Sequence, residues 1–304
     1  MSRVYHLFLF ILSIGTAAAQ QQVMFTQYMF NGLVLNPAYA GSHESISATA
    51  LYRNQWVGIE GAPNTKTFSI HSPVPGRNIG LGAFFVQDNI GVTTDNNFFL
   101  SYAYRMPLRN GTLSFGLQGG INNIQADYNE LELSDRNFQG SASSLKPNFG
   151  AGVYFSTDRF YAGMSTPYIL RNSSSTSDGA SLSSGVNVEQ IQHYYLTSGV
   201  VFDLSPYIKL KPSILVKAVQ GAPMELDFNA NVLFDEKLWV GVSYRSFDSV
   251  DLLLELQLNQ QLRLGYAYDI TTSDLGQVNS GSHEIMLNYR FVFSKNKVVT
   301  PRYF

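Results

Sequence analysis

The chain has 304 residues, no cysteine, and a formal net charge of -2 from 20 basic and 22 acidic residues. The lack of cysteine excludes a disulfide framework, a thiolate metal site, a cysteine nucleophile and an acylated lipoprotein cysteine, and the charge balance gives no basic excess that would attract nucleic acid. Only 14% of the residues are charged, against about a quarter in ordinary soluble chains. This shortfall indicates that much of the surface does not face water.

Residues 1–19 have the features of a secretory signal peptide. Arg3 precedes the apolar run LFLFILSIGTAAA, and Ala17 to Ala19 lead into an abrupt polar QQQ. We therefore predict cleavage after Ala19 and export of the mature chain from the cytoplasm. No later stretch is apolar for long enough to be a transmembrane helix.

Residues 20–43 form the next predicted unit, in front of the strands. Large apolar residues between Phe25 and Gly32 recur at helical spacing, and Asn36 followed by Pro37 ends any helix. We expect a short helical or strap-like segment that lies in the periplasm or in the lumen of a barrel.

Alternation with a period of two dominates residues 44–293, the predicted barrel, and residues 294–304 are a C-terminal tail. About fourteen segments alternate in this way, an even number as in bacterial single-chain barrels. The predicted strands are residues 44–53, 64–71, 78–86, 96–105, 112–122, 147–156, 159–165, 193–204, 207–218, 224–234, 238–245, 250–258, 262–270 and 283–293.

The connections between these segments alternate in length. The long polar ones are residues 54–63, 122–146, 166–190 and 271–282. Between them lie tight turns, at residues 72–77, 156–158 and 205–207. Long loops on one side and short turns on the other are typical of an up-and-down barrel in an outer membrane, with the short turns in the periplasm.

The two faces of the strands differ in polarity. One face is almost free of charge and has tyrosine-rich ends, such as Tyr102 with Tyr104 and Tyr266 with Tyr268, which are typical of an aromatic girdle. The other face carries the charges that we assign to the lumen: Arg105, Lys209, Lys211, Asp251, Glu255, Arg263 and Arg290.

A soluble β-sandwich shows the same alternation of faces. The signal peptide, the sorting of loops by length and the tyrosine-rich ends together favour a membrane barrel. We therefore predict an all-β protein, a transmembrane up-and-down antiparallel β-barrel of about fourteen strands with a short N-terminal helical or strap segment.

Glycines are frequent on the inward face of the predicted strands. They are Gly80, Gly82, Gly116, Gly120, Gly150, Gly152, Gly163, Gly241 and Gly265. One interpretation is that they relieve curvature in a closed sheet, and the pattern alone favours it. The alternative is that they leave room in the lumen for the N-terminal segment.

The sequence offers no catalytic set. No two histidines have ligand spacing, and neither a nucleophile elbow nor a phosphate-binding loop is present. Asp251 and Glu255 share a strand face, where a counter-charge to Arg245 or Arg263 is a simpler role than a catalytic carboxylate pair. We expect a protein that is not an enzyme and has no cofactor and no metal.

Several motifs resemble a known family. QYMFNGLVLNPAYAG is followed by LYRNQWVGIEGAPNT and GLGAFFVQDNIG, and HEIMLNYRF lies near the end of the chain. Together these motifs resemble the PorP/SprF family of outer-membrane proteins of the type IX secretion system, which includes gliding-motility members. The motifs supply the candidate partner-docking residues: Gln27, Asn31, Asn36, Pro37, Ala38, Tyr39, Gly41, Arg53, Asn54, Gln55 and Trp56.

The resemblance implies a non-enzymatic outer-membrane component that binds the C-terminal domain of a large secreted adhesin and supports its export, anchoring or gliding movement. Its expected partners are that domain, other type IX secretion or gliding-motility envelope proteins and outer-membrane lipid, with no nucleic acid. The alternative is an outer-membrane porin or hydrophobic-substrate transporter with an N-terminal plug. Single-channel conductance separates the two, since a steady open pore favours the transporter.

Overall fold

The computed structural model describes residues 23–127, 141–171, 173–174, 188–189 and 191–291. The predicted signal peptide, the C-terminal tail and parts of two long connections lie outside the described residues. The N-terminal segment contains three short helical turns: η1 (Tyr28–Phe30), α2 (Gly32–Leu35) and η2 (Pro37–Tyr39). A further 3-10 turn, η5 (Asp274–Gln277), lies in the last loop.

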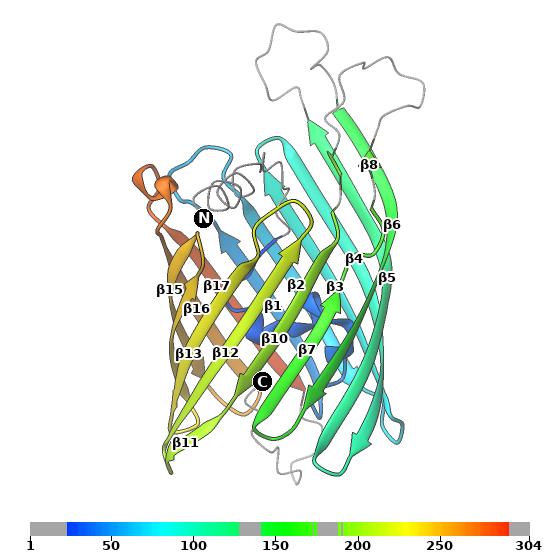
Figure 1. Cartoon of the computed structure of the whole chain (residues 1–304), viewed down its shortest axis with the longest axis vertical. Coiled ribbons are helices and arrows are strands. Elements are labelled where there is room, and N and C mark those ends of the chain that lie inside the picture. The colour runs from blue at the N-terminus through cyan, green and yellow to red at the C-terminus, as the bar shows by residue number, and fades with distance from the viewer. Residues whose placement is uncertain (1–22, 128–140, 172, 175–187, 190, 292–304) are drawn as a thin grey trace, which may run out of the picture.

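Fourteen antiparallel strands close into a barrel (Figure 1), which confirms the predicted fold class. The short β10 and β11 are one barrel strand interrupted at Val201, and both pair with β12. The strands are β1 (Ile46–Asn54), β2 (Asn64–Pro73), β3 (Ile79–Ile90), β4 (Thr93–Leu108), β5 (Gly111–Asp127), β6 (Ser141–Ser156), β7 (Phe160–Thr166), β10 (His193–Val200), β11 (Phe202–Ser205), β12 (Ile208–Val219), β13 (Glu225–Phe234), β14 (Leu238–Arg245), β15 (Ser249–Gln257), β16 (Leu262–Thr271) and β17 (Ser282–Phe291). A separate two-stranded ladder joins β8 (Ser173–Ser174) to β9 (Val188–Glu189).

The barrel closes where the first strand meets the last. β1 pairs with β17 in a register that sets Ile46 opposite Phe291 and Arg53 opposite Glu284. Every other neighbour in the barrel follows in chain order, so the topology is up-and-down. We call the two ends of the barrel the long-loop end and the short-turn end.

Two predictions about the connections need correction. Residues 122–127 and 141–146 are paired strand residues of β5 and β6 and not loop, because a run of Asn, Gln and Ser hides the period of two. The alternation of loop lengths is also incomplete, since β3 and β4 at the long-loop end are joined only by Gly91 and Val92.

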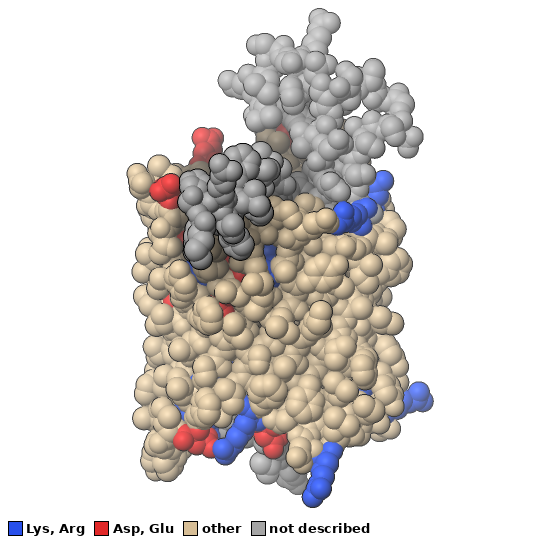
Figure 2. Space-filling view, viewed as in Figure 1, with Lys and Arg blue, Asp and Glu red and all other residues tan. Residues whose placement is uncertain are grey.

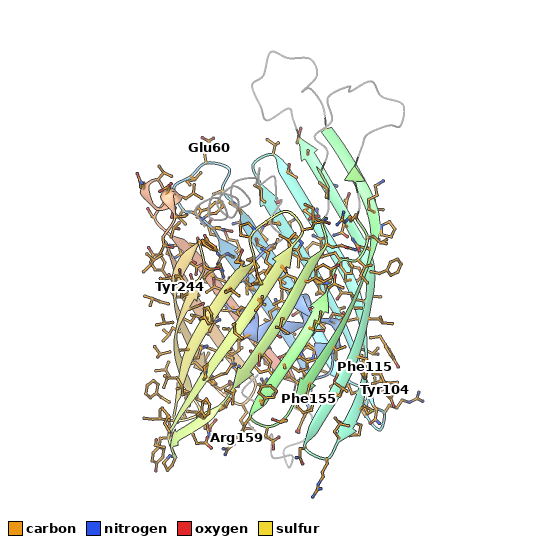
Figure 3. All side chains as sticks on the ribbon, in the orientation of Figure 1. Glu60, Tyr104, Phe115, Phe155, Arg159 and Tyr244 are labelled. Atoms are coloured by element: carbon orange, nitrogen blue, oxygen red, sulfur yellow. The ribbon has the colours of Figure 1, made fainter. Side chains whose placement is uncertain are left out.

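The outer face of the barrel is apolar. Large side chains such as Leu117 and Met164 are exposed by 64% and 61%, and Figure 2 shows a middle band nearly free of Lys, Arg, Asp and Glu, with charges at both ends. Aromatic side chains flank this band (Figure 3), with Tyr104 and Phe115 toward the short-turn end and Tyr244 toward the other. Such a belt is stable in lipid, where exposed apolar atoms avoid the cost of contact with water.

No helix among the described residues is long and apolar enough to cross a membrane. The buried core lies inside the barrel. There the N-terminal segment contributes Phe25, Tyr28 and Leu33, which pack among inward-facing residues of the strands such as Phe99 and Tyr195.

Candidate functional site

Residues 23–43, which we call the plug, run through the lumen from one end of the barrel to the other. Val23 and Met24 lie among residues of the long-loop end, including Trp56 and Phe247. Ala40 and Gly41 contact Gly80, at the start of β3 beside the short β2–β3 turn. The plug therefore lies inside the barrel, where the blue segment in Figure 1 shows its helical turns.

A buried group of charges holds the plug near the long-loop end. Arg53 of β1 places Nη2 2.7 Å from Asp269 Oδ2 of β16 and Nη1 3.2 Å from Glu284 Oε2 of β17. Thr26 of the plug donates its hydroxyl to Asp269 at 2.8 Å and accepts a bond of 2.8 Å from Arg53 Nη1. We call Arg53, Asp269, Glu284 and Thr26 the Arg53 cluster.

The plug backbone joins the same cluster. The amides of Thr26 and Gln27 donate to the two carboxylate oxygens of Glu284, at 2.9 and 2.8 Å. Charge-assisted bonds of this kind are shorter and stronger than neutral ones. Since all of these groups are almost fully buried, each charge is stabilised only while its partners remain in place.

The helical turns in the middle of the plug bond to the wall through neutral groups. Tyr28 Oη accepts a bond of 2.9 Å from Asn229 Nδ2, and Asn31 Oδ1 accepts one of 2.7 Å from Ser69 Oγ. Asn36 caps η2, because its Oδ1 accepts from the Ala38 amide at 2.9 Å, while its Nδ2 donates to the Val153 carbonyl at 3.0 Å. Pro37 at the first position of η2 suits that turn, since it has no amide hydrogen to satisfy.

Glycines of the wall let the plug backbone approach at the short-turn end. A Cβ added at Gly116 would lie 2.0 Å from the Ala38 nitrogen, and one at Gly80 would lie 2.0 Å from the Ala40 carbonyl oxygen. Gly152 and Gly163 face Asn36, Gly82 faces Leu33, and Gly265 faces Gln27. The structure thus supports the second interpretation of the inward glycines at these positions, whereas Gly120, Gly150 and Gly241 face other atoms of the barrel.

The predicted lumenal charges lie at different depths. Lys211 Nζ lies 4.9 Å from the centre of the Phe30 ring of the plug. Arg263 forms an ion pair with Glu255 at 2.9 Å and lies over the same ring. Asp251 is buried and accepts a bond from Ser249. Arg105 and Arg290 are half-buried on the inward face. Lys209, however, lies at the short-turn rim, within 3.2 Å of Asp203 and Glu236.

The predicted docking residues divide into two sets. Those from Gln27 to Gly41, together with Arg53, are buried in the lumen, where they belong to the plug or bond to it. Asn54, Gln55 and Trp56 lie at the end of β1 and in the following loop, where the Trp56 amide donates to Ser282 Oγ at 3.1 Å. Asp269 and Glu284, which complete the Arg53 cluster, were not among the predicted site residues; their sequence signal was only their place on the polar strand face.

An open cavity of about 570 Å³ lies above the plug at the long-loop end. We call it the vestibule. Plug residues Val23 and Met24, loop residues Trp56 and Phe247, and charged residues such as Glu225 line it. Two cavities beside the plug deeper in the lumen hold only about 30 and 10 Å³.

A closed barrel with an apolar outer belt and a polar lumen filled by its own N-terminal segment defines an integral outer-membrane protein. A family model described as "Type IX secretion system membrane protein PorP/SprF" matches residues 17–289, and the chain belongs to this family. The resemblance noted in the motifs is confirmed. The protein is an outer-membrane component of the type IX secretion system.

Comparison with curated proteins finds no match. Among solved structures, the chain is similar to the CymD monoaromatic hydrocarbon channel, with a TM-score of 0.49 and 10% identity over 86% of this chain and 92% of that one. It is also similar to the Acinetobacter baumannii outer membrane protein Omp33, with a TM-score of 0.48 and 8% identity over 83% of this chain and 100% of that one.

Proposed function

We propose that this barrel binds a large secreted surface adhesin through the adhesin's C-terminal domain, and that it supports export, anchoring or gliding movement of that adhesin without being an enzyme. The observation that carries this proposal is the plug. A barrel whose lumen is blocked by its own N-terminal segment is better suited to hold a partner at its mouth than to conduct a solute.

The contacts of the plug support a permanent place in the lumen. Removing the plug would leave Asp269 and Glu284 without the bonds from Thr26 and Gln27, and burying a carboxylate with fewer partners is costly. It would also leave gaps beside Gly80 and Gly116, where the plug backbone fills the space of absent side chains. The mouth that remains available is the long-loop end, which faces outside in outer-membrane barrels.

Deletion of the gene tests the proposal. We expect one adhesin to disappear from the cell surface, together with any gliding that depends on it, while other type IX cargo still reaches the outside. Loss of all type IX cargo would instead assign the protein to the general export machinery. If no surface protein were lost, docking would be refuted.

Conductance in planar bilayers tests the alternative function, an open porin or transporter. With the plug in place we expect no steady current from the purified protein. A steady open pore in the intact protein would support the porin or transporter alternative.

A further inference from the structure

The vestibule carries two aromatic residues in an unfavourable backbone conformation. Trp56 has φ of 49° and Phe247 has φ of 67°, in the left-handed region that bulky residues rarely adopt. The other described non-glycine residues with positive φ, Asp235 and Glu236, form a tight turn at the opposite end. Phe247 is also 78% exposed. An aromatic side chain that is both strained and in water indicates a contact surface for another molecule.

The vestibule wall also contains buried polar atoms that have no hydrogen-bond partner among the residues that the structure describes. The Lys217 side chain is 4% exposed, yet its Nζ makes no hydrogen bond and lies 3.6 Å from Glu225 Oε2. His193 is 3% exposed; its Nδ1 lies 2.9 Å from the Ile191 carbonyl oxygen, and its Nε2 has no partner. Both residues line the vestibule. A ligand that offers both donors and acceptors would satisfy them, and a polypeptide backbone offers both.

Carboxylates outnumber cations around the vestibule. Arg245 is shared by Asp227 and Asp248, each 3.2 Å away, and by the more distant Glu225 and Asp251. Asp88, which lines the cavity, accepts a hydrogen bond of 2.6 Å from Thr65 and forms no ion pair with any residue that the structure describes. The excess of negative charge favours a ligand that brings a basic side chain.

We propose that the vestibule binds an extended segment of the docked partner that carries at least one Lys or Arg side chain. The basic side chain lies near Asp88 on β3, the backbone reaches Lys217 and His193 on the opposite wall of the lumen, and Trp56 and Phe247 pack on the apolar side chains that flank it. This inference rests on the proposed docking function and names the place and chemistry of the contact.

The test uses the purified full-length barrel in detergent and the adhesin that the gene deletion removes from the surface. Phe247→Asn removes the aromatic ring but keeps a residue that tolerates positive φ, so the turn keeps its shape. We expect about tenfold weaker binding or more, as for a central aromatic contact. Glu236→Asn is the matched control, because it also places Asn at a position with positive φ, but at the short-turn end. It should leave binding unchanged.

The charge is tested separately. Asp88→Asn keeps an oxygen that accepts the bond from Thr65, and it should weaken binding severalfold, with a smaller dependence on salt. Asp235→Asn, in the short turn at the opposite end, is its control. As a defined probe, acetyl-Gly-Arg-Gly-Arg-amide should compete with the adhesin, whereas acetyl-Gly-Glu-Gly-Glu-amide should not. Equal competition by the two peptides would refute the proposal that the bound segment carries a basic side chain.

A photo-crosslinking amino acid at position 247 identifies the occupant. We expect an adduct with the mass of barrel plus adhesin. An adduct with a second copy of this chain, or within the chain itself, would overturn the inference. If the intact barrel binds the adhesin while Phe247→Asn and Asp88→Asn bind equally well, the vestibule is not the contact and docking still stands. If the intact barrel does not bind the adhesin, the docking function fails as well.

Discussion

The two ends of the plug are held by different forces. Near the long-loop end, Thr26 and Gln27 bond to charged side chains of the Arg53 cluster. Near the short-turn end, Pro37, Ala38 and Ala40 press their backbone against glycines of the wall. The first end is sensitive to removing an atom, because a buried charge then loses its partner. The second end is sensitive to adding one, because there is no space for it.

The largest expected effect is at the charged end. Arg53→Met removes the cation shared by Asp269 and Glu284 and leaves two buried carboxylates uncompensated. We expect the free energy of unfolding to fall by about 3–5 kcal/mol, measured by guanidinium titration in detergent and followed by tryptophan fluorescence. Steady current through the barrel should also appear, because the plug loses its anchor.

Arg159→Met is the control for Arg53→Met. Arg159 pairs with Asp203 at the short-turn rim, where its side chain is 66% exposed, and water and salt screen such a pair. Its replacement should change neither stability nor current. Equal effects of the two substitutions would show that burial of the Arg53 cluster is not what makes it important.

The glycine end is tested by adding one carbon. Gly116→Ala would bring a methyl group to 2.0 Å from the Ala38 nitrogen, so the plug must shift. Overpacking of this kind costs about 1–3 kcal/mol. Gly119→Ala on the same strand is the control, since its Cβ would meet only the Phe149 ring at 3.3 Å. If Gly116→Ala proved as stable as Gly119→Ala, the inference that the plug backbone contacts the wall at Gly116 would be wrong.

Asn36 is a test of the region between the two ends. Asn36→Ala removes the cap of η2 and the bond to the Val153 carbonyl, which should cost about 1 kcal/mol. Asn36→Asp keeps the oxygen that accepts from Ala38 but loses the donor to Val153. The same unfolding titration should place Asn36→Asp below the wild type, because its carboxylate loses the bond to Val153 and is buried without a cation. An Asn36→Asp variant as stable as the wild type would show that the bond to the wall does not matter.

An effect about as small is expected at Tyr28. Tyr28→Phe removes the acceptor of the Asn229 bond and keeps the ring in the core. We expect a loss of about 0.5–1.5 kcal/mol in the unfolding titration. Tyr207→Phe is the control, because Tyr207 is 70% exposed near the short-turn end. If Tyr28→Phe lowered the free energy of unfolding as much as Arg53→Met, the charged contacts of the plug would not be more stabilising than its neutral ones.

The strands were predictable because two different surroundings act on alternate residues. In β15, Leu252, Leu254 and Leu256 face outward, while Asp251 and Glu255 are buried in the lumen. Apolar and polar residues therefore alternate along the sequence with a period of two. Where both faces are polar, as in residues 122–127, the period of two disappears and the sequence predicts a loop in place of the strand.

The arrangement of the candidate site was less predictable. Helical spacing near Phe25 indicated a folded segment before the strands, but the contact between Thr26 and Glu284 spans 258 positions of sequence. Such a contact depends on how the barrel closes and how its strands are staggered, which no local pattern encodes. For the same reason, the alternation predicted that Lys209 lies on the inward face of its strand but not how far along the barrel axis it lies. The structure places it at the short-turn rim.

The Arg53 cluster crosses the seam of the barrel. Arg53 belongs to the first strand, Glu284 lies opposite it on the last, and Asp269 lies on the strand next to that. These three side chains meet only when the last strand is paired with the first. The same ion pairs that hold the plug therefore also fasten the first strand to the last.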